Sequence, residues 1–315
     1  MKYIKDIREG DNISETYLCR KKELGKKQSG DDYYALSLVD KTGTIDGKVW
    51  NPANPGIGEF ETGDYIHIDG FVKVFNQRPQ ITINRLRKLN EGEYDPDDYL
   101  PSSTKDVGTM YRELMGYIKS VKNQYLSELL NSVFINDKKV AKAFSEHSAA
   151  KSIHHAFKGG LLEHTVSVTR LCKAFAENYP ILNQDLILTA AMLHDIGKLN
   201  ELSDLPENDY TDEGQLLGHI YMGADFVGRK IDEIDNFPRK LKNEVLHCIL
   251  AHHGELEYGS PKKPALAEAF ALSMADNMDA KMETLNELFN TAVDDGWLGF
   301  QKNFESNIRK TGSWE

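Results

Sequence analysis

Alternating apolar and polar positions characterise the first 90 residues of the chain. Five short segments there carry β-branched and aromatic side chains at every second position, which is the period of a half-buried strand. Turn residues separate several of these segments, and a Gly- and Pro-rich stretch lies at 51–58. The pattern predicts a small β-domain over residues 1–90, with strands at about 12–23, 32–39, 44–50, 65–75 and 80–84.

The apolar period changes after residue 104, where hydrophobic side chains recur three or four positions apart, as on a helix. Met110, Leu114 and Ile118 begin this pattern. We expect a helical connector over residues 104–150 and an all-helical domain over residues 151–295. The chain is therefore predicted to be an α+β multidomain protein, with the β-domain first.

Polar segments interrupt the two periodic regions. Residues 91–103 are acidic and rich in turn formers, so they predict a linker between the domains. A second acidic, turn-rich segment, 200–217, predicts a loop inside the helical domain, with a helix opening at Gly218 and His219. Residues 296–315 form a tail, for which docking on a neighbouring subunit, contact with RNA and fraying all stay open.

Composition places the chain among globular proteins. Of its 315 residues, 40% are hydrophobic and 28% are charged, and no run of about 18 apolar residues predicts a membrane span. The first eleven residues are charged and lack the apolar core of a signal peptide. Three widely spaced cysteines argue against a disulfide framework and fit a reducing compartment. We expect a cytoplasmic protein with no membrane partner.

The net charge of −11 argues at first against a nucleic-acid partner. Its distribution weakens that argument, because residues 1–90 carry 15 Lys and Arg against 13 Asp and Glu. The acidic excess lies in the remainder of the chain, and salt screens it beyond about 10 Å. Charge alone does not decide the partner.

Histidine gathers in the helical region, where nine of the ten histidines lie between His147 and His253. Imidazole and carboxylate are both metal ligands, and neighbouring residues on a helix point roughly 100° apart. The adjacent pair His194 and Asp195 can therefore face two neighbouring ions, with Asp195 as a bridge. The candidate ligands follow one another along the chain as His164, His194, Asp195, His219, His252 and Asp276.

Several neighbours of these residues leave alternatives open. His253 competes with His252, and it would bind metal or substrate. Asp279 lies three residues after Asp276 on a similar helix face and competes with it. His154 and His155 would contact substrate phosphate or cap the following helix.

Lys198, one turn after Asp195, has two interpretations. It is either a catalytic cation that neutralises a phosphate oxygen or a surface residue at a helix end.

The sequences GGLLEHT, over residues 159–165, and MLHDIGK, over residues 192–198, resemble the motifs of HD-domain metal-dependent phosphohydrolases. The resemblance covers about residues 150–290, and every ligand position is filled. Two divalent ions in such a site hold a hydroxide and clamp a scissile phosphate. The mixed nitrogen and oxygen donors suit Mn²⁺, Fe or Co²⁺ better than Mg²⁺.

The strand pattern of residues 11–89 resembles an OB-fold barrel. OB-folds bind single strands by stacking bases on aromatic side chains beside a basic track. Half of the barrel side chains point inward, so each aromatic candidate fills the core or binds nucleic acid with about even odds. The candidates are Tyr34, Lys48, Trp50, Lys73, Phe75 and Arg78.

An OB-fold ahead of an HD domain with these two motifs is similar to the YhaM-type bacterial 3′-5′ exoribonucleases. The resemblance implies release of nucleoside 5′-monophosphates from single-stranded RNA, Mn²⁺ dependence and a homo-oligomer, and it adds single-stranded DNA as a candidate substrate. The alternative function is an HD-domain nucleotide or cyclic-dinucleotide phosphohydrolase, in which the OB-fold is a regulatory module.

Overall fold

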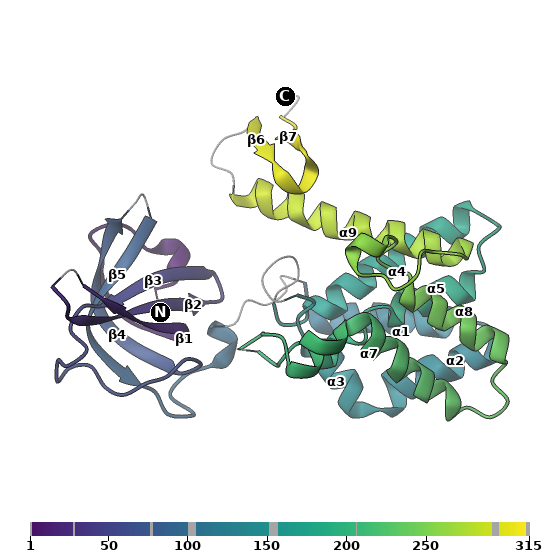
Figure 1. The fold of residues 1–315 in the computed structure, drawn as a ribbon, viewed down its shortest axis with the longest axis horizontal. Helices are drawn as coiled ribbons and strands as arrows, with labels where there is room; N and C mark the ends of the chain where they lie inside the picture. Colours follow the sequence, from purple (N-terminus) through teal and green to yellow (C-terminus); the bar gives the residue numbers. More distant parts are fainter. Residues whose placement is uncertain are drawn as a thin grey trace.

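A β-barrel and a separate body of helices make up the molecule, and a short β-hairpin stands at the end of the longest helix (Figure 1). The computed structural model describes residues 2–27, 29–75, 78–99, 105–150, 157–205, 207–291 and 296–312.

The barrel has five strands and is closed in the order β1-β2-β3-β5-β4. Strand β1 is 15 residues long; its first half pairs with β4 and its second half with β2, so it closes the barrel. Strands β3 and β5 run parallel, and the other pairs are antiparallel. This strand order confirms the predicted OB-fold. The strands are β1 (Asn12–Lys26), β2 (Asp32–Asp40), β3 (Gly43–Val49), β4 (Tyr65–Phe75) and β5 (Arg78–Lys88).

Inward-facing apolar side chains such as Leu38, Ile66 and Ile81 fill the barrel, and all three are fully buried. A second, smaller cluster attaches the first part of the expected linker to the outside of the barrel. The rings of Tyr65 and Tyr94 stack with centroids 3.8 Å apart, and Tyr99 is buried beside them. These aromatic contacts hold residues 94–99 against the barrel.

Nine α-helices form the body in the described residues, and five of them are capped by side chains that the sequence places just before them. The capping side chains of α1, α2, α3, α5 and α7 each accept a hydrogen bond from a backbone N–H in the first turn, and they are Asp106, Asn123, Asp137, Asn183 and Thr211. The helices are α1 (Val107–Ser120), α2 (Gln124–Asn131), α3 (Lys138–Glu146), α4 (Gly160–Asn178), α5 (Gln184–Leu193), α6 (Lys198–Glu201), α7 (Asp212–Asp232), α8 (Arg239–Leu250) and α9 (Ala267–Thr291).

The predicted loop over residues 200–217 is wrong at both ends. Helix α6 already covers Lys198–Glu201, and α7 begins at Asp212 because Thr211 caps it. The backbone leaves the helical conformation only at Gly218, whose φ is 72°. The sequence signal at Gly218 therefore marks a break within a helix, not its beginning.

Small side chains bring α4, α5, α8 and α9 close together. Ala190, Ala191, Ala251, Ala269 and Ala275 are all fully buried in one cluster where these four helices meet. Cys172 and Cys248 lie in the same cluster as free, buried thiols. In the part of the chain that the structure describes, no helix has the length and apolar character needed to cross a membrane.

The expected tail contains two strands. Strands β6 (Trp297–Gln301) and β7 (Ser306–Arg309) form an antiparallel hairpin beyond the end of α9. Figure 1 shows this hairpin projecting away from the helical body.

Candidate metal centre and nucleic-acid face

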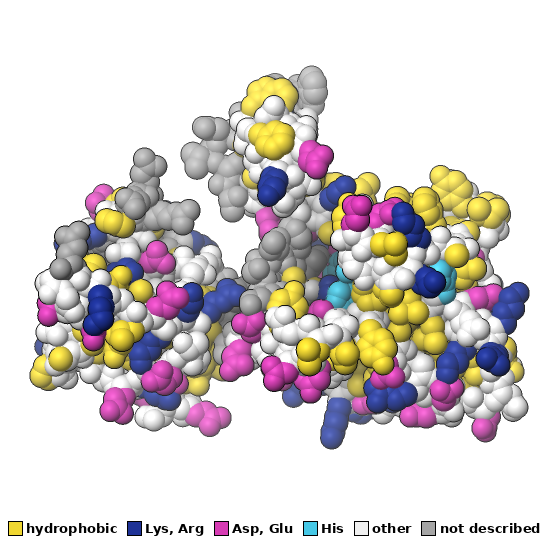
Figure 2. All heavy atoms as spheres, viewed as in Figure 1, with side chains coloured by type: hydrophobic (Ala, Val, Ile, Leu, Met, Phe, Trp, Pro, Cys, Tyr) yellow, Lys and Arg dark blue, Asp and Glu magenta, His cyan; other side chains and the backbone are white. Residues whose placement is uncertain are grey.

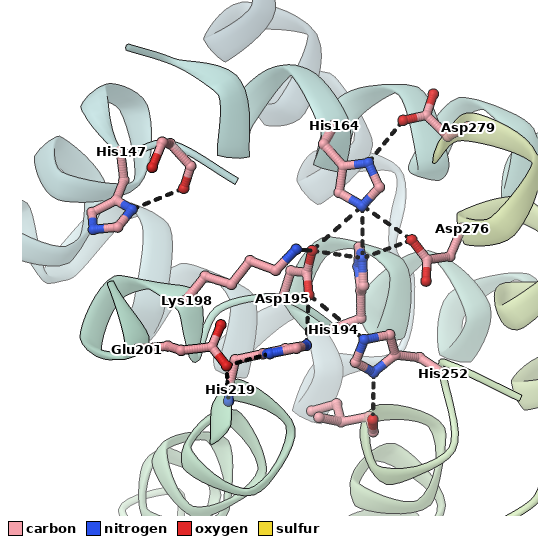
Figure 3. Close-up of polar contacts among 12 residues, drawn as sticks. His147, His164, His194, Asp195, Lys198, Glu201, His219, His252, Asp276 and Asp279 are labelled. Atoms are coloured by element: carbon pink, nitrogen blue, oxygen red, sulfur yellow. Dashed lines mark hydrogen bonds and ion pairs between the residues drawn. The ribbon is translucent and has the colours of Figure 1, made fainter. Parts of the chain in front are cut away.

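Five separate segments bring the six candidate ligands to one buried place (Figure 3). Only three of the six lie within a helix: His164 in the first turns of α4, His219 directly after the break in α7, and Asp276 in α9. The remaining ligands follow the ends of α5 and α8, where the chain turns. Those ligands are His194, Asp195 and His252.

The first group of ligand atoms surrounds one oxygen of Asp195. His164 Nε2 lies 3.2 Å from His194 Nε2 and 3.2 Å from Asp276 Oδ1. Asp195 Oδ2 lies 3.4 Å from the Nε2 atoms of both histidines. Atoms of His164, His194 and Asp276 all lie within 4.8 Å of one another, so they can bind one ion together.

The second group surrounds the other oxygen of Asp195. Oδ1 lies 3.5 Å from His219 Nε2 and 3.6 Å from His252 Nε2. His253 joins these two histidines in a second set of mutually close donors. The two oxygens of one carboxylate thus face two groups of donors, which is the arrangement expected of a bridging ligand.

Three atoms of the second group are buried without any hydrogen-bond partner: Asp195 Oδ1, His219 Nε2 and His252 Nε2. Leaving a buried polar atom unpaired costs roughly 1–3 kcal/mol, so three that point at one another require an explanation. A divalent cation would satisfy all three at once. The residues of this structure therefore fit a metal ion at the second group.

The outer nitrogen of each candidate histidine has a defined partner. His194 Nδ1 and His252 Nδ1 donate to the backbone carbonyls of Ala191 and Ile249, at 2.8 and 2.7 Å. A carbonyl only accepts, so both rings carry the proton on Nδ1 and present the lone pair of Nε2 to the centre.

Carboxylates hold the other two histidines. His164 Nδ1 lies 2.7 Å from Asp279 Oδ2, and His219 Nδ1 lies 2.9 Å from Glu201 Oε1. Glu201 also accepts from the backbone N–H of His219 at 2.9 Å. Such partners behind metal-binding histidines fix the ring and raise its basicity.

The structure shows how Asp276 differs from Asp279, and how His252 differs from His253. Asp276 reaches the centre, whereas Asp279 lies behind His164 and also accepts a hydrogen bond from the Ser167 hydroxyl. His252 is fully buried, whereas His253 is partly exposed and its Nδ1 bonds the carbonyl of Tyr258. His154 and His155 lie outside the described residues.

Sequence analysis missed Glu201, which no motif marks. Its position three residues after Lys198, opposite His219, follows only from the contact between α6 and α7. That contact depends on Gly197, because a Cβ there would lie 2.1 Å from the backbone oxygen of His219.

Charge pairs shift the pKa values of several residues at the centre. Burial alone would lower the pKa of His164, but the carboxylates of Asp195, Asp276 and Asp279, which accept hydrogen bonds from its ring, outweigh burial and hold that pKa well above its usual value. Burial would raise the pKa of Asp195, but the charge of Lys198 and the surrounding histidines hold it well below its usual range. Lys198 Nζ lies 2.7 Å from Asp195 Oδ2, and its side chain is 17% exposed, so it is not a surface lysine.

Comparison with known proteins places this centre in a family. The family model "HD domain" matches residues 161–281, which contain all six candidate ligands. The 3′-5′ exoribonuclease YhaM of Bacillus velezensis is 33% identical over 277 residues, which cover 87% of this chain and 86% of the relative. The chain belongs to the YhaM family. The YhaM of Bacillus subtilis is 32% identical over 283 residues, which cover 88% of this chain and 87% of that protein.

The barrel of this YhaM-family chain is similar to the second OB-fold domain of replication protein A from Methanococcus maripaludis. The likeness has 21% identity and a TM-score of 0.23, and it covers 29% of this chain and 96% of that domain. The OB-fold assignment of the barrel rests on the strand order.

The barrel separates the candidate nucleic-acid residues into inner and outer ones. Tyr34 packs against the barrel core and edge-on to Phe60, which agrees with the first of its two interpretations, a side chain that fills the core. Its neighbour Tyr33, which sequence analysis missed, lies on the outer face because side chains alternate along a strand. The Tyr33 ring lies 5.1 Å from that of Trp50, and Lys48 Nζ lies 4.9 Å above it.

Other candidates lie further along the barrel of this YhaM-family chain. Lys73 Nζ lies 4.9 Å over the ring of Phe71, a second aromatic that sequence analysis missed. Phe75, at the end of β4, is 64% exposed. The side chain of Arg78 lies outside the described residues.

Proposed function

We propose that this chain is a divalent-metal-dependent 3′-5′ exoribonuclease that acts on single-stranded RNA and releases nucleoside 5′-monophosphates. The observation that carries the proposal is the pair of ligand groups that share Asp195. The name of the YhaM relatives supports the direction of degradation and the RNA substrate.

The donors suit Mn²⁺, Fe or Co²⁺ better than Mg²⁺, and the resemblance to YhaM favours Mn²⁺ among the three. Imidazole nitrogens outnumber carboxylate oxygens in the second group and equal them in the first, whereas Mg²⁺ prefers oxygen ligands and water. His164, His194 and Asp276 would hold one ion, and His219, His252 and His253 the other, with Asp195 between them. Two ions held in this way supply an activated water nucleophile and neutralise charge on the scissile phosphate.

Lys198 adds a cation beside the centre. Its ammonium group contacts Asp195 Oδ2 and remains partly accessible, so it is placed to neutralise a phosphate oxygen of the substrate. The side chains that hold the histidines from behind, Asp279 and Glu201, keep the Nε2 atoms directed at the centre.

The barrel supplies affinity for the upstream strand. Its outer face offers Tyr33, Trp50 and Lys48 for base stacking and phosphate contact. Stacking does not require a 2′-hydroxyl, so single-stranded DNA is expected to bind as well. When the 5′-phosphate of the terminal nucleotide lies at the centre, the leaving oxygen is the 3′-oxygen of the preceding nucleotide, and the shortened RNA keeps a 3′-hydroxyl.

The same chain exposes an apolar face that favours a homo-oligomer. Phe270, Met274, Met278 and Met282 follow one side of α9 at intervals of four residues, and each is 45–59% exposed. A groove of about 430 Å³ adjoins them between α9 and the end of α4. Figure 2 shows apolar side chains gathered over this edge of the helical body. Exposed patches of this kind mark interaction sites, so a Met278→Lys variant should lower the mass measured by light scattering.

End-labelled RNA tests the proposed reaction. A 5′-labelled 20-mer with Mn²⁺ should give a ladder of shortening products that stops near a stable hairpin, and a 3′-labelled one should release a labelled mononucleotide at once. The same RNA with a chelator is the control. Internal fragments appearing first would indicate an endonuclease. Intact RNA beside rapid hydrolysis of free nucleotides or cyclic dinucleotides would favour the phosphohydrolase alternative.

A further inference from the structure

One face of the C-terminal hairpin carries two exposed aromatic side chains. Trp297 is 70% exposed and Phe300 is 65% exposed. Side chains three residues apart on a regular strand point to opposite faces, but the register shifts between these two residues. Gly299, with a φ of +77°, lies within the shift and adopts a backbone conformation that other residues rarely take. The extra residue places both rings on the same face.

The opposite strand completes this face with polar groups. Arg309 pairs directly with Trp297, and Asn307 pairs with Phe300. Cross-strand partners lie about 5 Å apart on the same side of a sheet. The face therefore combines two aromatic rings with a guanidinium group and an amide. Leu298 and Ile308, which belong to the same two strands, are partly buried.

Nothing in the hairpin's fold accounts for the exposure of its aromatic rings. An isolated two-stranded hairpin is marginally stable in water, and large apolar groups left in solvent add nothing to its stability. Figure 1 shows the hairpin standing clear of the helical body, and Figure 2 shows apolar and basic side chains following one another down its visible face. The rings are therefore free to take part in binding.

Charge indicates the class of partner. The described residues of the hairpin and its flanks include the cations Lys302, Arg309 and Lys310 and one acid, Glu305, in a chain whose net charge is −11. Within this described part, Lys302 and Arg309 form no ion pair. Exposed aromatic rings beside unpaired cations are suited to stack on bases and contact phosphates of a single strand.

We propose that Trp297, Phe300 and Arg309 form a second binding site for single-stranded RNA, separate from the barrel. The proposal rests on the function proposed above, and it adds a site to which neither the HD domain nor the OB-fold contributes. The other candidate partner for an exposed aromatic face, a second protein chain, is distinguished by the test below.

The position of the hairpin sets the length of RNA that reaches it. Helix α9 carries Asp276 and continues for fifteen residues to Thr291. At 1.5 Å per residue, the helix end lies about 22 Å from the metal centre along the axis. A stacked strand advances about 3.4 Å per nucleotide, so the hairpin site is expected to bind nucleotides roughly six positions or more from the 3′ end. Oligonucleotides of four residues should not use it.

Fluorescence anisotropy with labelled RNA in the presence of a chelator measures binding without turnover. In the full chain, Trp297→Ala should raise the Kd for an unstructured 20-mer about tenfold and leave the Kd for a 4-mer unchanged. Trp297→Phe should retain most of the affinity, because the ring still stacks. Trp297→Leu should behave as Trp297→Ala, because an apolar contact without a ring does not replace stacking. Arg309→Ala should weaken binding and reduce its salt dependence.

Matched substitutions control for general effects on charge and exposed surface. Lys240→Ala removes an exposed cation on α8, and Tyr210→Ala removes an exposed aromatic outside the hairpin; neither should change the Kd. Unchanged RNA affinity in Trp297→Ala, while the wild-type chain binds, would overturn the hairpin site alone. Full affinity in Trp297→Leu together with a lower mass in Trp297→Ala would assign the face to a protein interface instead. A wild-type chain that neither binds nor degrades RNA would refute the proposed function.

Discussion

The metal centre and the outer face of the barrel differ in how firmly their side chains are held. At the centre, six side chains from five segments converge in the interior, and each histidine is held from behind by a carboxylate or a backbone carbonyl. On the barrel, Tyr33 and Lys48 are partly exposed and Trp50 is exposed, and the Tyr33 ring contacts both of the other side chains. The metal centre fixes the positions of a few ligand atoms, whereas the outer face of the barrel is an exposed surface whose side chains are less constrained.

This difference predicts how each region responds to substitution. A buried polar atom that loses its partner still bears the full cost of desolvation. Substitution of any one ligand should therefore impair the whole metal centre. Exposed stacking residues contribute separately, so the barrel should lose affinity in small steps.

Asp195→Asn should have the largest effect, because among the described residues Asp195 is the only carboxylate whose two oxygens face both ligand groups. We expect nearly complete loss of RNA turnover and reduced metal content by elemental analysis, with an unchanged circular dichroism spectrum. Wild-type activity in this variant would contradict the bridging role.

Asp279→Ala should have an intermediate effect, because Asp279 contacts His164 only from behind. Loss of such a partner typically costs about 10–100-fold in metal affinity or activity. A competition assay with a coloured chelator would measure the metal affinity directly. Asp225→Asn, which alters an exposed pair with Arg229 on α7, is the matched control and should leave the affinity unchanged.

Metal uptake should depend on pH in a defined direction. The pKa of His164 is held well above its usual value without metal, so this ring is protonated near neutral pH. A ligand nitrogen must lose its proton, and the apparent metal affinity should therefore rise by up to about tenfold per pH unit below that raised pKa. Titration calorimetry in buffers of different ionisation enthalpy should detect the released proton. An affinity independent of pH would mean that His164 is not a ligand.

Tyr33→Ala and Tyr34→Ala change neighbouring residues but should affect different properties. The first should weaken RNA binding, and the second should lower the stability of the fold. Tyr33→Ala should weaken RNA binding by about 1 kcal/mol, which is roughly fivefold in Kd, with an unchanged melting temperature. Tyr34→Ala should lower the free energy of unfolding by about 1–3 kcal/mol, because its ring packs on the barrel core and on Phe60. Weaker RNA binding in Tyr34→Ala together with lower stability in Tyr33→Ala would mean that Tyr34 binds RNA and that Tyr33 stabilises the barrel.

The sequence predicts the architecture well, because both domains have clear apolar periods. Strict alternation identifies all five barrel strands to within a few residues, and a helical period identifies the body. The boundaries of α7 were missed, because the cap at Thr211 lies inside an acidic segment that resembles a loop. The hairpin after α9 was not predicted, because its bulge at Gly299 breaks the alternation.

The candidate site likewise contains residues that the sequence predicts and residues that it does not. His-Asp and Gly-His motifs mark the side chains that face the centre, since chemistry restricts which residue types can bind metal there. No such motif marks Glu201 or Tyr33. Glu201 acts through the packing of α6 on α7, and the outward direction of Tyr33 depends on a strand register that places its ring against Gly25. Both depend on contacts between segments, which a linear pattern does not contain.

The bridging carboxylate is the central claim, and a Mn²⁺ titration followed by electron paramagnetic resonance tests it most directly. Two ions that share Asp195 should bind with a stoichiometry of two per chain and should give a spin-coupled signal distinct from that of isolated Mn²⁺. Asp195→Asn should lose the coupled signal. A single equivalent of Mn²⁺, or two equivalents that give only the signal of isolated ions, would contradict the shared centre.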